Sequence, residues 1–102
     1  MSDIGEARKT LLKRILEGTG KAPSSERRAA FSNRDLSGPL GVLVDKVALR
    51  SDRITGQDIN AARESGLSED QIFEIVVCAA VGQANRQHDA ALAALDGAPG
   101  KE

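Results

Sequence analysis

The sequence predicts an all-α protein of about five helices with a long central C-terminal helix. Apolar residues recur at helical spacings of three and four along most of the chain, and no segment shows the period-two alternation of a strand. With 102 residues, of which 40% are hydrophobic, the chain is expected to form a single domain over residues 1–102, with its core at about 38–96.

The first two helices are expected ahead of this core. An apolar stripe predicts an amphipathic helix over about 3–17, and its members are Ile4, Ala7, Leu11, Leu12, Ile15 and Leu16. A connector rich in glycine and serine follows. A brief helix is then predicted over residues 25–33, capped by Ser24 or Ser25, with Arg27 and Arg28 on a solvated face.

The third helix is predicted over about 38–50. Ser37 is expected to cap it, and Pro39 suits its first turn. Its apolar stripe consists of Leu40, Leu43, Val44, Val47 and Ala48. Val42 and Leu49 lie off this stripe, so this helix is expected to carry a second contact surface.

Two capping boxes predict the starts of the last two helices. Thr55 and Asp58 open a short helix that is expected to end at Gly66. Ser68 and Gln71 have the same spacing, which is typical of a serine cap answered by a side chain one turn later. The final helix is therefore predicted to begin directly after Ser68.

This final helix is predicted to continue to Gly97 and to form the centre of the core. Between Ile72 and Val81 only Glu74 is charged, as in a helix that is buried on most sides. About 28 residues give a length of about 42 Å, whereas a 100-residue globule has a radius of gyration of about 13 Å. Either the helix bends near Gly82, or its far half packs on another subunit.

Glu74 and Cys78 are the first candidates for chemistry, because both lie in the apolar run. Cys78 is expected to be a small hydrophobic core residue, since Glu74 one turn earlier raises a thiol pKa by like-charge repulsion. Glu74 itself has three alternatives: it emerges at the surface, it pairs with Arg50, Arg53 or Arg63, or it acts as a general acid or base.

Asn85, Arg86 and His88 are the candidate ligand-binding or interface residues farther along the same helix. Cys78 and His88 are about 15 Å apart along a straight helix, so a cysteine–histidine relay within one chain is excluded. His88 also flanks an apolar stripe, where an interface histidine is expected. The catalytic candidates are therefore Glu74, Cys78 and His88.

Composition argues against several classes of function. The net charge of −1 and the near absence of aromatic residues disfavour nucleic-acid binding, and the bases around Arg8 and Lys13 are expected on a solvated face. No segment approaches the roughly 18–20 apolar residues of a membrane span.

No spacing typical of metal ligands and no phosphate-binding glycine loop is present, so neither metal nor cofactor is expected. A single cysteine and the lack of a signal-peptide pattern indicate a cytoplasmic protein.

A composite pattern spans roughly residues 40–96. A short helix is followed by Gly66-Leu67-Ser68, an acidic pair, Ile72, a long apolar helix and Asn85-Arg86. In this order the chain resembles the alkylhydroperoxidase D / carboxymuconolactone decarboxylase superfamily. The resemblance implies an all-α homo-oligomer, either a dimer, a trimer or a hexamer.

The same resemblance implies that the functional residues of that superfamily are missing here. The Cys-x-x-Cys pair and histidine of its peroxidase branch fall near Ser51, Ile54 and Asp58, and the histidine of its decarboxylase branch also falls near Asp58. The residues that the dithiol mechanism requires are therefore absent from this chain.

Two hypotheses follow. The first is a noncatalytic oligomeric module that binds a small molecule or a protein partner in a groove between subunits, with Glu74, Asn85, Arg86 and His88 as the polar lining. The second is a peroxidase- or decarboxylase-related enzyme with a rebuilt site, where Cys78 or Glu74 of one chain meets Arg86 or His88 of another.

Overall fold

The computed structural model describes residues 2–97 and, from Glu6 onward, their side chains. Residue 1 and residues 98–102 of the expected domain lie outside this described range. The described part contains α1 (Ser2–Glu17), α2 (Ser24–Ser32), α3 (Gly38–Leu49), the 3-10 turn η1 (Ser51–Arg53), α4 (Gly56–Glu64) and α5 (Glu69–Gly97). Residues 2–97 contain no strand, so the predicted all-α class with five α-helices is confirmed.

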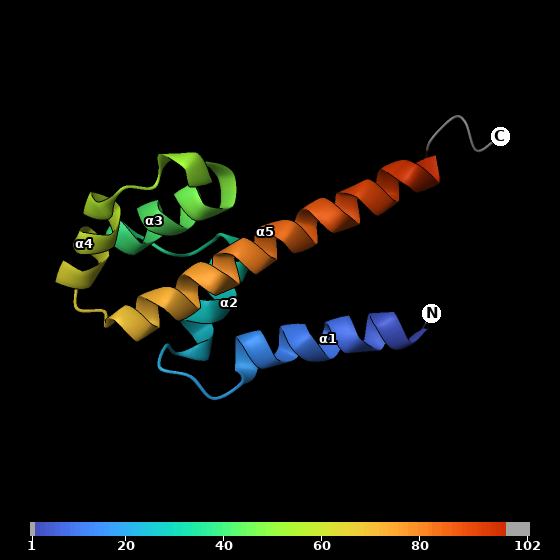
Figure 1. Ribbon diagram of the computed structural model, residues 1–102, viewed down its shortest axis with the longest axis horizontal. Coiled ribbons are helices and arrows are strands. Elements are labelled where there is room, and N and C mark those ends of the chain that lie inside the picture. Colours follow the sequence, from blue (N-terminus) through green and yellow to red (C-terminus); the bar gives the residue numbers. More distant parts are fainter. Residues whose placement is uncertain (1, 98–102) are drawn as a thin grey trace.

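Helix α5 is the axis of the molecule (Figure 1). Helices α3 and α4 lie on one side of α5, α1 lies on the other, and the start of α1 and the end of α5 lie at the same end of the molecule. Helix α5 runs unbroken for 29 residues, so the first of the two alternatives for this long helix, a bend near Gly82, is not found. The molecule measures 55 × 29 × 20 Å, because the C-terminal half of α5 projects beyond α2, α3 and α4, in the direction in which α1 also extends.

The hydrophobic core forms where α5 packs against α2, α3 and α4. One cluster of buried residues consists of Ala22, Ala30, Leu40, Val44, Ile75, Cys78 and Ala79, and a second consists of Leu43, Ala62 and Ile72. The core thus extends beyond the expected range of 38–96, because Ala22 and Ala30 come from the connector and helix that precede it. Small side chains at these positions allow α2 and α5 to approach closely.

The capping residues decide where the last helices begin. The Thr55 hydroxyl accepts from the amide of Asp58, whose carboxylate accepts from the amide of Thr55, and this confirms the first capping box. Ser68 and Gln71 exchange the corresponding bonds at 3.1 and 2.9 Å, which confirms the second. At Gly66 the backbone is left-handed, with a φ of +112°, as a helix stop requires.

The expected caps of α2 and α3 are not formed. Helix α2 begins at Ser24 itself, its cap position is occupied by Pro23, and no side chain caps it. Ser37 does occupy the cap position of α3, but its hydroxyl makes no capping hydrogen bond. Local sequence spacing therefore located these two helices without fixing how their first amides are satisfied.

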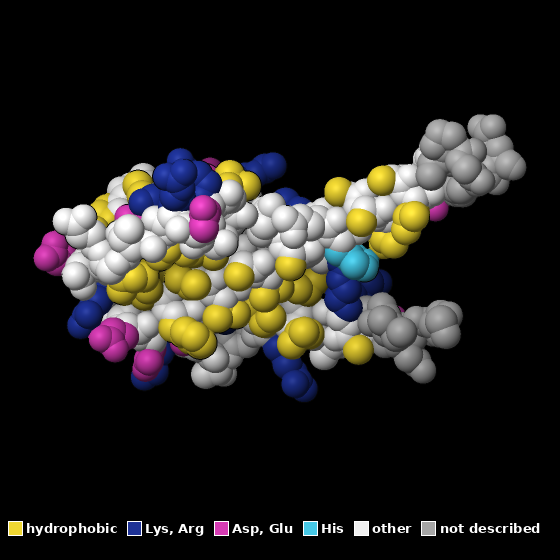
Figure 2. Space-filling view, turned by 45° about the horizontal axis from the view of Figure 1, so that its top comes forward, with side chains coloured by type: hydrophobic (Ala, Val, Ile, Leu, Met, Phe, Trp, Pro, Cys, Tyr) yellow, Lys and Arg dark blue, Asp and Glu magenta, His cyan; other side chains and the backbone are white. Residues whose placement is uncertain are grey.

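Several large apolar side chains remain on the surface. Val42 and Leu49 are exposed, as expected for a second face of α3, and Phe73 is 70% exposed although it lies within the apolar run of α5. Figure 2 shows hydrophobic side chains exposed along the body of the molecule and again on the projecting end of α5. Within residues 2–97, no helix has the length and apolar character needed to span a bilayer.

Candidate functional site

Glu74 is held by backbone amides that come from the connector before α2. Its carboxylate accepts from the amide of Lys21 at 2.9 Å and from the amide of Ala22 at 2.8 Å. These bonds join positions 52 and 53 residues apart in the chain. None of the three arginines proposed as its partner forms an ion pair with it: Arg50 pairs with Asp45, Arg53 with Asp52 and Arg63 with Glu69.

The surroundings of Glu74 favour its ionised form. The amides of Ala22 and Lys21 lower the pKa of this carboxyl below its usual value, and the nearby charges of Arg27 and Lys21 act in the same direction. A general acid at neutral pH needs the opposite shift. Glu74 is therefore arranged as a fixed anion that orders the connector between α1 and α2.

Cys78 lies in the core, where its side chain is 1% exposed. Its sulfur is 3.8 Å from the carbonyl oxygen of Ile15. Burial raises the pKa of the Cys78 thiol, Glu74 adds to the rise as expected, and Arg27 opposes both. A buried thiol with a raised pKa is a poor nucleophile, because the thiolate is the reactive form.

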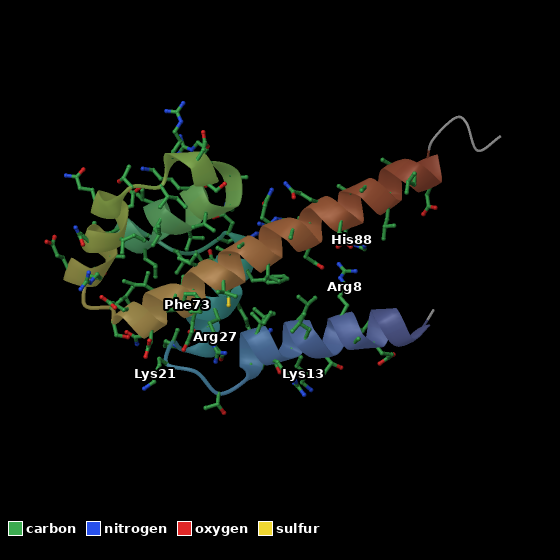
Figure 3. All side chains as sticks on the ribbon, in the orientation of Figure 1. Arg8, Lys13, Lys21, Arg27, Phe73 and His88 are labelled. Carbon is green, nitrogen blue, oxygen red and sulfur yellow. The ribbon has the colours of Figure 1, made fainter. Side chains whose placement is uncertain are left out.

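Arg27 is the site residue that the sequence did not predict. It was expected on a solvated face, yet it is only 7% exposed and donates to the carbonyl oxygens of Ala22 and Ile15 at 3.1 Å each. Arg27 lies where α2 passes close to α5, beside Phe73 (Figure 3). The available signal was its position three residues before the buried Ala30, which places both on one face of α2.

Arg86 also serves the contact between α2 and α5. Its Nη1 donates to the carbonyl oxygen of Phe31 at 2.6 Å, and its Nη2 donates to Gln83 at 2.9 Å. The same Phe31 oxygen lies against Gly82, where an added Cβ would be only 1.9 Å away. Gly82 and Arg86, which lie one turn apart on α5, thus both contact the carbonyl oxygen of Phe31 near the C-terminal end of α2.

Asn85 and His88 lie on the C-terminal half of α5. Arg8 extends from α1 toward this half of the helix (Figure 3). Arg8 donates to the side-chain oxygen of Asn85 and forms an ion pair with Asp89 at 3.3 Å. The His88 side chain is half exposed, and its Nδ1 is 3.8 Å from the carboxylate of Asp89. These contacts tie α1 to α5 at the surface, about 10–15 Å along the helix from Cys78.

Asp58 lies in the first turn of α4 and contacts α3. Its carboxylate accepts from the Lys46 ammonium at 3.0 Å and from the Thr55 amide at 2.9 Å. These two partners, with the Thr55 bond the stronger influence, hold the pKa of Asp58 below its usual value. Asp58 therefore links α3 to α4 as an ion pair and helix cap.

Only part of the sequence-predicted set comes together. Glu74 and Cys78 share, with Arg27, Arg14 and Phe73, the lining of a cavity of about 180 Å³. Asn85, Arg86 and His88 are not among its lining residues. Two larger open hollows, of about 450 and 630 Å³, lie around the loop between α2 and α3, and no sequence-predicted site residue lines either of them.

The described side chains offer no obvious place for a metal. Across residues 6–97, no three His, Cys, Asp or Glu side chains are grouped so that they could hold an ion. The cavity beside Cys78 instead combines one carboxylate, two guanidinium groups and an apolar wall, which suits a small organic ligand better than a cation.

Comparisons with protein-family models, with curated proteins and with solved structures found no match to this chain.

Proposed function

We propose that the chain is a noncatalytic, cytoplasmic helical module, related to the alkylhydroperoxidase D / carboxymuconolactone decarboxylase superfamily. In this proposal it works as a homo-oligomer and binds a small molecule or a protein partner in a groove between subunits. The scaffold is kept, whereas the thiols and histidine of the superfamily's chemistry are replaced by Ser51, Ile54 and Asp58.

One observation carries this proposal: the groups that look reactive are occupied in holding the fold. Glu74 anchors the connector before α2, Cys78 is packed in the core, and Arg86 holds the end of α2. A catalytic group needs access to substrate and a pKa near the working pH. Glu74 and Cys78 are shifted away from that range in opposite directions.

The alternative is an enzyme whose site is rebuilt at a subunit interface. The cavity of about 180 Å³ favours it, because Arg27 could there stabilise an anion beside Glu74 and Cys78. This alternative requires that the Cys78 thiol, or the Glu74 carboxylate, becomes accessible and reactive in the assembled protein.

The rate at which a chromogenic disulfide reagent modifies Cys78 separates the two. In the noncatalytic module, Cys78 should react in the native protein at least about 100-fold more slowly than in denaturant, because reaction waits for local opening. The rate is measured over about pH 5–9.

A matched control places a thiol on the surface of the same helix. The double variant Cys78→Ala, Ala93→Cys moves the only thiol to an exposed position of α5 and should react at the same rate in the native and denatured states. Fast native modification of wild-type Cys78, with an apparent pKa below about 8.5, would contradict the proposal and favour the enzyme.

A further inference from the structure

Helix α5 has an apolar face on the side opposite the core. Its buried residues, which include Ile75, Cys78 and Gly82, define the core-facing side. At about 100° per residue, a second row lies about half a turn away from them. This row consists of Phe73, Val77, Ala80, Ala84, Ala91 and Leu95, with His88 as its one polar member.

None of these residues is buried, and the two largest, Phe73 and Leu95, are 70% and 65% exposed. The outward face of a helix in a lone globular domain is normally polar. Here it carries no Asp, Glu, Lys or Arg from Phe73 to Leu95. An exposed row that is apolar except for one histidine is typical of a contact surface.

The spacing of its residues keeps the row on one side of α5 along its whole length. From Phe73 to Ala84 the steps are four, three and four residues, and from Ala84 to Leu95 they are again four, three and four. This is an 11-residue repeat of about 3.67 residues per turn, close to the 3.6 of a straight α-helix. The row therefore follows the unbroken helix for about 33 Å without winding away from one side.

The row is also symmetric about Ala84. Phe73 and Leu95, the largest members, lie at equal distances on either side of it, and Val77 and Ala91 lie at equal distances nearer to it. In an antiparallel pair, each Phe73 faces Leu95 of the partner subunit and each Val77 faces the partner's Ala91. The small Ala84 meets its own copy at the centre, where two helices must approach closely.

We propose that two copies of this chain pair antiparallel through this row, with a twofold axis at Ala84. The inference rests on the proposed homo-oligomer and deepens it, because it names the surface and the symmetry. A twofold interface must be self-complementary. A row with the same spacing in both directions, a large apolar side chain at each end and a small one at its centre suits that requirement. The pair also gives the projecting half of α5 a surface to pack on.

Other occupants of the row fit less well. A membrane surface attracts helices that carry lysine and arginine beside the apolar face. Helix α5 carries five acidic residues, Glu69, Asp70, Glu74, Asp89 and Asp96, against the single Arg86. An unrelated protein partner would give no reason for the two halves of the row to match.

The interface described here does not assemble the alternative active site. His88 of the partner subunit lies opposite Ala80, on the outward face of α5. Cys78 points to the core-facing side and is buried there. The pairing is therefore a contact between scaffolds, and it covers Phe73 and Val77, two of the residues that line the cavity beside Cys78.

The mass of two charge variants in solution tests the pairing. Ala84→Glu places two carboxylates face to face at the twofold axis, whereas Ala93→Glu makes the same change about half a turn away on the same exposed part of α5. By sedimentation equilibrium the wild type should be a dimer of twice 10.7 kDa, or a hexamer built from such pairs. Ala84→Glu should weaken the twofold association at least about tenfold, Ala93→Glu should leave it unchanged, and circular dichroism should show equal helix content.

Each other outcome overturns the proposed oligomer, the proposed pairing or both. A wild type that stays at 10.7 kDa at all concentrations removes both the oligomer and the pairing. An oligomer that tolerates Ala84→Glu, or a trimer, keeps the proposed module but overturns the pairing, because a twofold pair cannot close a ring of three.

Disulfide cross-linking tests the register independently. Under mild oxidation Ala84→Cys should form a covalent dimer, because the two new thiols meet at the axis. Ala91→Cys should not, because its symmetry-related copy lies about 21 Å away along the helix. The wild-type protein, which carries the Cys78 thiol and neither new cysteine, is the control for cross-linking through Cys78. Cross-linking of both variants would indicate a parallel pair, and cross-linking of neither would overturn the register.

Discussion

Glu74 illustrates how a lone charge in an apolar helix is accommodated. Its carboxylate accepts hydrogen bonds from the amides of Lys21 and Ala22 in place of water. These two amides precede α2, so the hydrogen bonds within that helix do not satisfy them. Gly20 is part of this arrangement, because an added Cβ there would lie 2.8 Å from the Glu74 oxygen. The charge is thus structural, and its contribution depends on its ionisation.

We predict that Glu74→Gln lowers the free energy of unfolding by about 1 kcal/mol at pH 7, because charge-assisted bonds become weaker ones at a site that solvent partly screens. The folded pKa of Glu74 lies below its unfolded value of 4.5, so its contribution is present above pH 4.5 and disappears as the pH falls through the folded pKa. Urea unfolding of wild type and variant between pH 3 and 7 measures this.

The control for this prediction is Glu64→Gln, which alters an exposed carboxylate at the end of α4. It should change stability little at any of these pH values. A Glu74→Gln effect that stays constant down to pH 3 would show that ionisation is not the cause, and no effect at pH 7 would remove the anchoring role.

At the level of single residues, the sequence indicated which side chains require a hydrogen-bond partner better than it identified the partner. It indicated that Glu74 requires a partner, but the amides that satisfy it lie 52 and 53 residues away, so no local spacing could identify them. It placed Arg27 on a solvated face, because a charged residue is rarely buried. Its acceptors, the carbonyls of Ala22 and Ile15, become available only after α1 and α2 pack together.

At the level of elements, the closest contact in the fold is the one between α2 and α5. The carbonyl oxygen of Phe31 reaches the backbone of α5 at Gly82 and is bound there by Arg86. Glycine at this position is explained by this approach and not by a bend, since α5 is continuous through it. The position therefore has no room for any side chain.

We predict that Gly82→Ala destabilises the protein by about 3 kcal/mol, because the new methyl group would force α2 away from α5 and strain the buried core. In Gly56→Ala the added Cβ meets nothing within 4 Å, and the change should be neutral or slightly stabilising by about 0.5 kcal/mol. Urea midpoints of both variants against wild type provide the comparison. Equal stability of Gly82→Ala and wild type would contradict the close approach.

Helix boundaries were predictable where the information is local. The boxes at Thr55–Asp58 and Ser68–Gln71 and the left-handed Gly66 depend on residues within one turn, and all are found. The expected serine cap of α2 is wrong, and Ser37 takes the expected cap position of α3 without forming a capping hydrogen bond. Serine only favours a cap, and tertiary contacts decide whether the bond forms. The length of α5 was predictable, whereas the sequence alone left open whether the helix bends near Gly82.

At the scale of the whole molecule, α5 has two apolar sides and the single chain covers only one of them. The core side packs on α2, α3 and α4, and the row from Phe73 to Leu95 stays exposed. Beyond Asp89 the helix has no buried residue at all within the described range. An isolated helical extension of this kind frays in water, because its stability comes from packing and not from propensity alone.

The proposed pair places a second copy over the outward row of α5. Hydrogen–deuterium exchange at the backbone amides of residues 90–97 reports on this claim, because protection there requires packing that one chain does not supply. We predict clear protection at high protein concentration, lost on dilution and in Ala84→Glu but kept in Ala93→Glu. Exchange of these amides at the unprotected rate at every concentration would contradict the claim.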